Sequence, residues 1–203
     1  MSVKSIGIID YGLGNLASVS NSLKKIGYRV KVSSDLEVLD KVDLLILPGV
    51  GAYPKAMKLL NELGLVNFIK SKARKNLPIL GICLGMQLLA ESSTEQGNTN
   101  GLGLISGNVI SFKEDRTHVG WNKISMIEDS GLMKKFNSQL MYFNHSYYLN
   151  SSKDKIIAKS IHIETFPAVI KRGNIIGVQF HPEKSQMIGI NFLKLIIKGF
   201  SSA

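Results

Sequence analysis

The chain has 203 residues, of which 44% are hydrophobic and 20% are charged. This is enough apolar material for one sizeable core, which excludes a disordered chain and a coiled coil and predicts a single domain over residues 1–203. The 25 Lys and Arg residues against 15 Asp and Glu residues give a net charge of +10. Because these basic residues are scattered singly or in short pairs, we expect a lysine-rich surface and no nucleic-acid partner, with an acidic protein as the next alternative.

Neither a membrane span nor a secretory leader is expected. No run of about 18 apolar residues occurs, and the chain begins directly with a strand-like segment. A cytoplasmic protein without membrane association is therefore predicted. The single cysteine, Cys83, excludes an internal disulfide, and we expect no metal site and no cofactor.

Short β-rich runs alternate with helical patterns in the first half of the chain. The expected strands are 3–9, 28–32, 43–47 and 78–82, and the expected helices are 16–26 and 56–75. Strands that alternate with helices indicate right-handed crossovers and a parallel sheet. Ligands then bind at the carboxyl ends of the strands.

From about residue 105 the strands follow one another closely, which is typical of antiparallel pairing. They are expected at 108–112, 123–127, 140–143, 156–160, 168–171 and 175–180. Residues 92–101 are expected to form a loop, and a last helix covers 189–198. The predicted fold class is therefore α/β, an open, mostly parallel sheet flanked by helices with an antiparallel extension.

The segment Leu80–Gln87 has the pattern of a nucleophile elbow, with Gly81 and Gly85 on either side of Cys83. A sharp turn from strand to helix places the central residue in a strained conformation and leaves no room for neighbouring side chains. A thiol there meets the positive end of the next helix, which favours the thiolate. Taken alone, Cys83 could instead be a small buried hydrophobic residue.

A second motif, His181-Pro-Glu183, follows the expected strand 175–180. Side chains two apart on an extended segment lie on the same side, so the Glu183 carboxylate can orient the His181 imidazole. This is the base and acid half of a Cys-His-acid triad. A surface histidine beside an unrelated glutamate is the alternative for this motif alone.

A third segment, residues 47–52, is a glycine-rich turn after the strand 43–47. Gly49 and Gly51 permit unusual torsions, so the turn can aim backbone N–H groups at a developing oxyanion. An ordinary glycine turn would have the same composition.

Together these segments resemble the class I (triad) glutamine amidotransferases, and in particular the HisH family of glutaminase subunits of imidazole glycerol phosphate synthase. The resemblance covers essentially the whole chain. It rests on Asp10–Asn15, Pro48–Gly51, Gly81–Gln87, Gly101–Leu104, Gly120–Asn122, His145–Tyr147 and Gln179–Ser185.

The resemblance implies a role for each matching residue. Cys83 would be the nucleophile and His181 the general base and acid, oriented by Glu183. The oxyanion hole would be formed by Val50 or Gly51 together with Leu84. Further residues match family positions that hold the amino-acid end of L-glutamine or that face the synthase partner: Gln87, Glu95, Ser146 and Tyr147 for glutamine, and Asn15, Trp121 and Lys184 for the partner.

The implied reaction is hydrolysis of glutamine through a γ-glutamyl thioester. The ammonia released must reach an acceptor, and this chain has no room for an acceptor domain. In the family the partner is a (β/α)8 barrel cyclase, so a heterodimer is expected.

A different class of function, a nucleotide-binding oxidoreductase, is the remote alternative. Gly12-x-Gly14-x-x-Ala17 follows the first strand, and Asp35 follows the second, which is the spacing of a dinucleotide fingerprint. That alternative leaves the Cys83 and His181 motifs unexplained, and Asn15 offers a helix N-cap without any phosphate.

A paralogue that serves another synthase is the nearer alternative. His118 lacks the proline and methionine that usually flank it in the family, Asn144 replaces an aliphatic residue, and residues 53–55 replace a more typical Phe-Gly-Asp. Related pairs supply ammonia for acetamidino sugars of surface polysaccharides such as lipopolysaccharide. Histidine biosynthesis remains the preferred role, with sugar amidination as the alternative.

Overall fold

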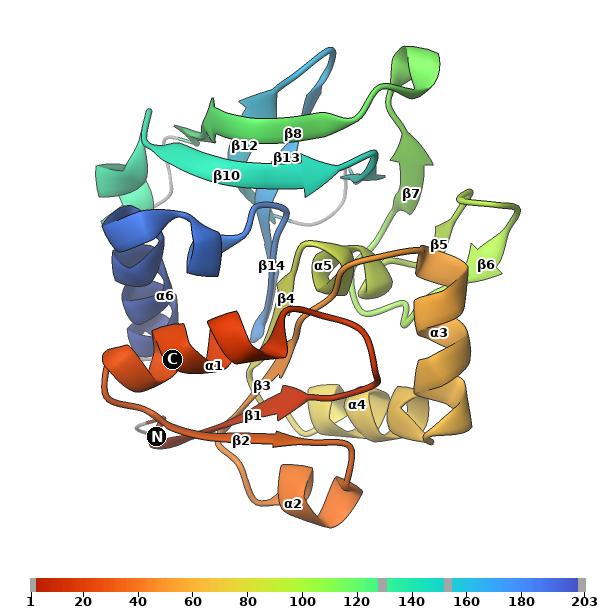
Figure 1. The fold of residues 1–203 in the computed structure, drawn as a ribbon, viewed down its shortest axis with the longest axis vertical. Helices are drawn as coiled ribbons and strands as arrows, with labels where there is room; N and C mark the ends of the chain where they lie inside the picture. Colours follow the sequence, from red (N-terminus) through yellow and green to blue (C-terminus); the bar gives the residue numbers. More distant parts are fainter. Residues whose placement is uncertain (1–2, 128–130, 152–154, 201–203) are drawn as a thin grey trace.

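A computed structural model describes residues 3–127, 131–151 and 155–200 (Figure 1). Its centre is an eight-stranded sheet with the order β2-β1-β3-β4-β14-β13-β12-β9. The parallel strands are β2 (Arg29–Ser33), β1 (Ser5–Ile9), β3 (Leu44–Leu47), β4 (Ile79–Ile82) and β14 (Ile175–Val178). The antiparallel strands are β13 (Thr165–Arg172), β12 (Lys155–Ile161) and β9 (Ser125–Met126). The predicted α/β class with an antiparallel extension is confirmed.

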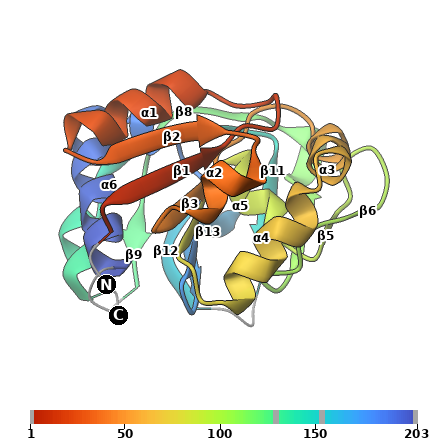
Figure 2. The same ribbon diagram turned by 90° about the horizontal axis from the view of Figure 1, so that it is seen from below.

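Helices cover both faces of this sheet. Figure 2 shows α1 (Leu16–Lys25) and α6 (Gln186–Phe200) on one side, and α3 (Tyr53–Glu62) and α4 (Leu65–Arg74) on the other. The shorter helices are α2 (Leu36–Asp40), α5 (Leu84–Leu88) and the 3-10 turns η1 (Lys113–Asp115), η2 (Gly131–Phe136) and η3 (Pro182–Lys184). No helix in the described part of the chain is both long enough and apolar enough to cross a membrane.

Strand alternation divides the apolar side chains between two cores. On β3, Leu44 and Ile46 join the cluster that includes α1 and α6, whereas Leu45 and Leu47 join the cluster that includes α3 and α4. Successive side chains of a strand point to opposite faces, so a continuous apolar run is what a doubly covered parallel strand requires. The run at 43–47 is therefore explained by its central place in the sheet.

Two smaller sheets accompany the main sheet. One is a ribbon of β8 (His118–Lys123) and β10 (Leu140–His145), and the other contains β11 (Tyr147–Asn150), β7 (Asn108–Ser111), β5 (Ser92–Ser93) and β6 (Thr99–Asn100). The His181 N–H donates to the carbonyl of Tyr142 on β10 at 2.8 Å, which ties the ribbon to the end of β14.

The predictions for one helix and for one strand were wrong. The single helix expected at 56–75 is two helices, because Gly64 between them has φ +68°, a left-handed conformation that interrupts a right-handed helix. The strand expected at 175–180 ends at Val178 and pairs in parallel with β4, and it is antiparallel only to β13. It thus completes the parallel sheet instead of belonging wholly to the antiparallel extension.

Other boundaries also differ from the sequence prediction. The strand expected at 123–127 is divided between β8, which begins five residues earlier at His118, and the short β9. The loop expected at 92–101 contains the two-residue strands β5 and β6, and β11 was not predicted.

Candidate active site

Cys83 lies at a sharp turn between β4 and α5. Its backbone has φ +53° and ψ −113°, a region that L-residues rarely occupy. A Cβ at Gly85 would overlap the carbonyl oxygen of Leu47, and one at Gly81 would lie 2.7 Å from the carbonyl oxygen of Gly85. Gly85 therefore allows the elbow to pack against β3, and Gly81 allows α5 to pack closely against the end of β4.

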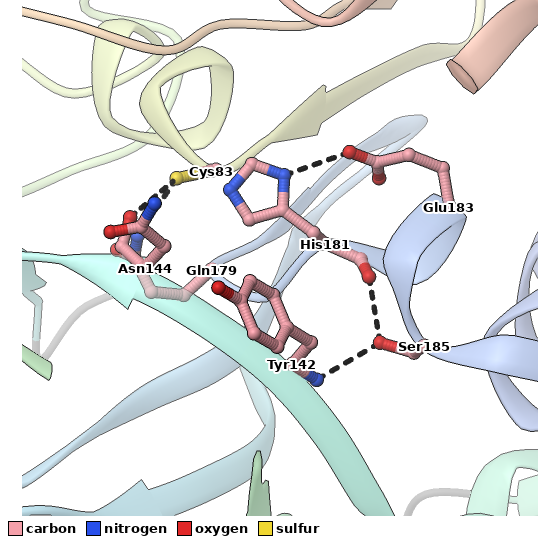
Figure 3. A network of polar contacts seen from close by, with 7 residues as sticks. All are labelled: Cys83, Tyr142, Asn144, Gln179, His181, Glu183 and Ser185. Atoms are coloured by element: carbon pink, nitrogen blue, oxygen red, sulfur yellow. Dashed lines mark hydrogen bonds and ion pairs between the residues drawn. The ribbon is translucent and has the colours of Figure 1, made fainter. Parts of the chain in front are cut away.

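His181 follows the end of β14 after Gln179 and Phe180, and its ring lies between Cys83 and Glu183 (Figure 3). Its Nδ1 lies 2.8 Å from Oε1 of Glu183, and both side chains are 1% exposed. The other ring nitrogen, the buried Nε2, faces the Cys83 sulfur. Cys83 and His181 come together because β4 and β14 are neighbouring strands, and the Cys83 N–H donates to the carbonyl of Val178 at 2.8 Å.

Opposing effects act on the pKa of His181. Burial lowers this pKa, but the negative charge of the Cys83 sulfur and the Glu183 carboxylate raise it, and together they outweigh burial and bring it to about 10. The imidazole is thus held in a form that can give a proton to a group bound beside Cys83.

A pocket of about 220 Å³ opens beside Cys83. It is lined by Val50, Gly51, Cys83, Leu84, Gln87, Glu95, Asn144, His145, Ser146 and Tyr147. Every residue expected at the oxyanion hole or at the amino-acid end of glutamine therefore borders the same pocket. Those expected roles stay predictions.

The glycine-rich turn after β3 is held against the elbow. Tyr11 donates its hydroxyl to the carbonyl of Pro48 at 2.8 Å, and burial together with the charge of Cys83 raises the pKa of this tyrosine. A Cβ at Gly49 would lie 2.9 Å from Leu84, and Gly51 has φ +104°. The turn can approach Leu84 because residue 49 is glycine, and glycine at residue 51 permits the positive φ.

The walls of the pocket are braced by hydrogen bonds between distant segments. Gln87 donates its Nε2 to the carbonyl of Tyr147 at 2.7 Å and to Oε1 of Gln179 at 3.2 Å. Glu95 accepts the N–H of Tyr53, the first residue of α3, at 3.0 Å. The Ser146 hydroxyl lies 2.9 Å from that of Thr117.

The three residues expected at the partner face lie on neighbouring elements. Trp121 on β8 is 45% exposed and contacts the ring of Tyr142 edge-on, while the Lys184 ammonium lies 5.6 Å from the centre of the same ring. Asn15 precedes α1, which packs against η3, the turn that carries Lys184. Asn15 occupies the N-cap position of α1, as expected, although its side chain makes no capping hydrogen bond.

Four further residues support the site and were not predicted. Ser185 donates its hydroxyl to the carbonyl of His181 at 2.6 Å and accepts the N–H of Tyr142 at 3.0 Å. The Cys83 sulfur lies 3.9 Å from Nε2 of Gln179 and 3.7 Å from the carbonyl oxygen of Asn144. Gln179 and Ser185 flank the His181 motif and could have been suspected from it, whereas Tyr142 and Asn144 approach only through the fold.

The residues of the apparent dinucleotide fingerprint have local structural roles. The Asp35 carboxylate accepts the N–H of Glu37 at 2.8 Å as the N-cap of α2. Gly12 donates its N–H to the Asp10 carboxylate at 3.0 Å in a tight turn. Gly12 and Asp35 thus have structural roles that require no nucleotide.

Comparisons with known proteins agree with the motifs. The family described as glutamine amidotransferase class-I matches residues 7–194. The imidazole glycerol phosphate synthase subunit HisH of Listeria monocytogenes is 48% identical over 193 residues, covering 93% of each chain. The protein of the same name from Halalkalibacterium halodurans is 46% identical over 199 residues, again with 93% of each chain covered. These names give no support to the lipopolysaccharide alternative.

Solved structures share the fold. A putative GMP synthase protein from Thermoplasma acidophilum aligns with a TM-score of 0.75 at 21% identity, over 100% of this chain and 96% of that chain. A protein described as a glutamine amidotransferase aligns with a TM-score of 0.77 at 20% identity, over 96% and 98%. From the matched family and the two HisH relatives, we conclude that the chain belongs to the class I glutamine amidotransferases and, within them, to the HisH subunits of imidazole glycerol phosphate synthase.

Proposed function

We propose that this chain hydrolyses L-glutamine to glutamate and ammonia as the glutaminase subunit of an imidazole glycerol phosphate synthase, in histidine biosynthesis. A single glutaminase domain over residues 1–203 is part of the proposal. The observation that carries it is the placement of Cys83 and the His181–Glu183 pair at the ends of adjacent parallel strands, beside one pocket. A cytoplasmic location stays a prediction.

The first half of the reaction is transfer of the glutamyl group to Cys83. The thiolate attacks the carboxamide carbon of glutamine, and backbone N–H groups of Val50 or Gly51 and Leu84 stabilise the oxyanion. The C–N bond then breaks while His181 gives its proton to the leaving nitrogen, which departs as ammonia. A γ-glutamyl thioester remains on Cys83.

The second half is hydrolysis of that thioester. His181, now neutral, takes a proton from a water molecule as its oxygen attacks the thioester carbon. The C–S bond breaks, glutamate leaves and the thiolate returns. Glu183 keeps the imidazole in the orientation that both steps need, because its carboxylate holds Nδ1 at 2.8 Å.

The ammonia must pass to a separate synthase subunit. Protonation would remove its nucleophilic lone pair, so release into water would compete with transfer. We propose that a (β/α)8 barrel cyclase docks over Asn15, Trp121 and Lys184 to form a heterodimer. The exposed Trp121 ring and the Lys184 ammonium beside Tyr142 support this assignment.

The test is the replacement Cys83→Ser. We expect glutamine hydrolysis to be lost, because a serine hydroxyl is far less ionised than the thiol, while the small change in volume leaves the fold intact. Glutamate release and the melting temperature are measured on the same samples. Turnover like that of the wild type would refute the mechanism, and an unfolded variant would instead assign Cys83 a packing role.

A further inference from the structure

Behind the pocket, three of the four histidines of the chain form one cluster. His118 on β8 is paired with His145 on β10 in the ribbon register, and its ring stacks on that of His162 at 4.5 Å. His118 and His145 are buried, and the cluster packs against Phe112, Phe143 and Phe166. No group of three or more potential ligands in the described ranges is arranged to hold a metal ion, so this cluster calls for another explanation.

Two of these histidines, His118 and His145, form a hydrogen-bond chain whose direction is fixed at both ends. At one end, Nδ1 of His145 lies 2.9 Å from the carbonyl oxygen of Tyr147, which can only accept. At the other end, the Nδ2 amide of Asn122 lies 3.1 Å from Nε2 of His118 and donates to the carbonyl of Ile161 at 2.7 Å. Between them, Nδ1 of His118 lies 3.1 Å from Nε2 of His145.

Only one arrangement of protons satisfies all of these contacts. His145 donates from Nδ1 to Tyr147, so the Nε2 of its neutral ring must accept, and His118 must donate from Nδ1. Nε2 of His118 then accepts from Asn122. Burial lowers the pKa of both rings, to about 3 for His145 and about 4 for His118, so both are neutral near pH 7.

The hydrogen-bond chain ends at Tyr147, in a wall of the glutamine pocket. The carbonyl of Tyr147 accepts from His145 on one side and from Gln87 on the other, and residues 144–147 all line the pocket. In addition, Thr117, the residue before His118, lies within hydrogen-bond distance of the Ser146 hydroxyl. The start of β8 thus supports this wall at two successive residues.

We propose that His118 is a positioning residue for glutamine binding, which fixes the tautomer of His145 and thereby the orientation of the Tyr147 carbonyl and the wall 144–147. The inference rests on the proposed function and deepens it, because the wall is the part of the site assigned to the amino-acid end of glutamine. That end does not react, so contacts with it are the same in the ground state and in the transition state. Loss of such contacts raises KM and leaves kcat nearly unchanged.

The first test compares His118→Phe with His162→Phe. Both replacements keep an aromatic ring and remove two nitrogens, but only His118→Phe interrupts the hydrogen-bond chain. We expect His118→Phe to raise the KM for glutamine about 10-fold or more with kcat within about threefold, and His162→Phe to leave both near the wild-type values. The variant His118→Asn returns a donor to the position of Nδ1 and should recover most of the KM, although it lacks the ring.

The second test is the tautomer itself, read from the ring nitrogens by NMR. In the wild type both His118 and His145 should carry the proton on Nδ1, and His145 should lose this single form in His118→Phe. An unchanged KM in a folded His118→Phe, or a wild-type His145 protonated on Nε2, would overturn the inference. If the wild type failed to hydrolyse glutamine, the proposed function would fall, and the tautomers would still decide whether the chain of hydrogen bonds exists.

Discussion

Two buried histidines of this protein have pKa values shifted in opposite directions, because their rings have different neighbours. For His181, burial is outweighed by Cys83 and Glu183, and the pKa rises to about 10. His145 has only neutral groups and other histidines around it, so burial lowers its pKa to about 3. One ring can therefore carry the proton of the reaction, while the other supports the pocket as a neutral hydrogen-bonding group.

The lowered pKa values of His118 and His145 predict a loss of stability in acid. Both lie below the unfolded value of about 6.5, so the unfolded state binds protons first as the pH falls. The stabilisation from neutral rings is complete above pH 6.5 and is lost as the pH falls toward about 4 and about 3. Each ring contributes a slope of up to about 1.4 kcal/mol per pH unit.

The measurement is urea unfolding of the wild type and of His118→Phe between pH 4 and pH 7. The variant has one titrating ring fewer, so its free energy of unfolding should fall less steeply below pH 6.5. Parallel curves for the two proteins would show that His118 is not held neutral by the fold.

Sequence motifs predicted only part of the site. Cys83 and His181 could be found because an elbow and a strand end each have a local pattern. His118 and Asn144 could not be assigned their contacts, because both act through the ribbon of β8 and β10, which approaches the site only in three dimensions. Both residues lie far in sequence from Cys83 and His181, so only the fold brings them together, whereas the missed residues Gln179 and Ser185 flank the His181 motif.

At the scale of elements, the elbow depends on the close approach of α5 to β3. In Gly85→Ala the new Cβ would overlap the carbonyl oxygen of Leu47, and neither backbone can move without disturbing the sheet. We expect a loss of about 2–4 kcal/mol in the free energy of unfolding, together with loss of glutamine hydrolysis. Urea unfolding and glutamate release measure the two effects.

Gly199→Ala in α6 is the matched control. A Cβ at Gly199 meets nothing within 4 Å, so alanine should be neutral or stabilise the helix by up to about 1 kcal/mol. If both variants behaved alike, the proposed packing of the elbow against β3 would be wrong.

Helices and strands with strong periodicity were predicted well, but the points at which a helix or strand is interrupted were not. The pattern at 56–75 is apolar at helical spacing on both sides of Gly64, so nothing in the spacing revealed the left-handed glycine that separates α3 from α4. Similarly, the strand that ends at Val178 is followed by two residues that the apolar pattern did not separate from it. Its parallel pairing with β4 depends on a chain segment almost one hundred residues away, which local patterns do not contain.

At the scale of the whole molecule, the site should respond to docking of the synthase partner. The pocket contains Val50, which is 37% exposed, on the turn expected to supply an oxyanion donor. If docking aligns this donor, the isolated chain should hydrolyse glutamine about 10²- to 10³-fold more slowly than the complex. Steady-state glutamate release with and without cyclase and its substrate measures the difference.

Two replacements of similarly exposed apolar residues locate the docking face. Trp121→Ala, at a residue 45% exposed, should weaken binding and activation by the cyclase, whereas Leu63→Ala, at a residue 43% exposed between α3 and α4, should not. An isolated chain as fast as the complex, or equal effects of the two variants, would contradict activation through the ribbon.

The insertion of β14 between β4 and β13 has a consequence for the order in which the protein is made. Until residues 175–178 leave the ribosome, β4 has no neighbour on that side, and its amide and carbonyl groups form an open edge. Cys83 is likewise synthesised long before His181. If Cys83 and His181 have the proposed roles, the reactive centre is completed only when nearly the whole chain has been synthesised, and unfinished chains contain the proposed nucleophile without its base.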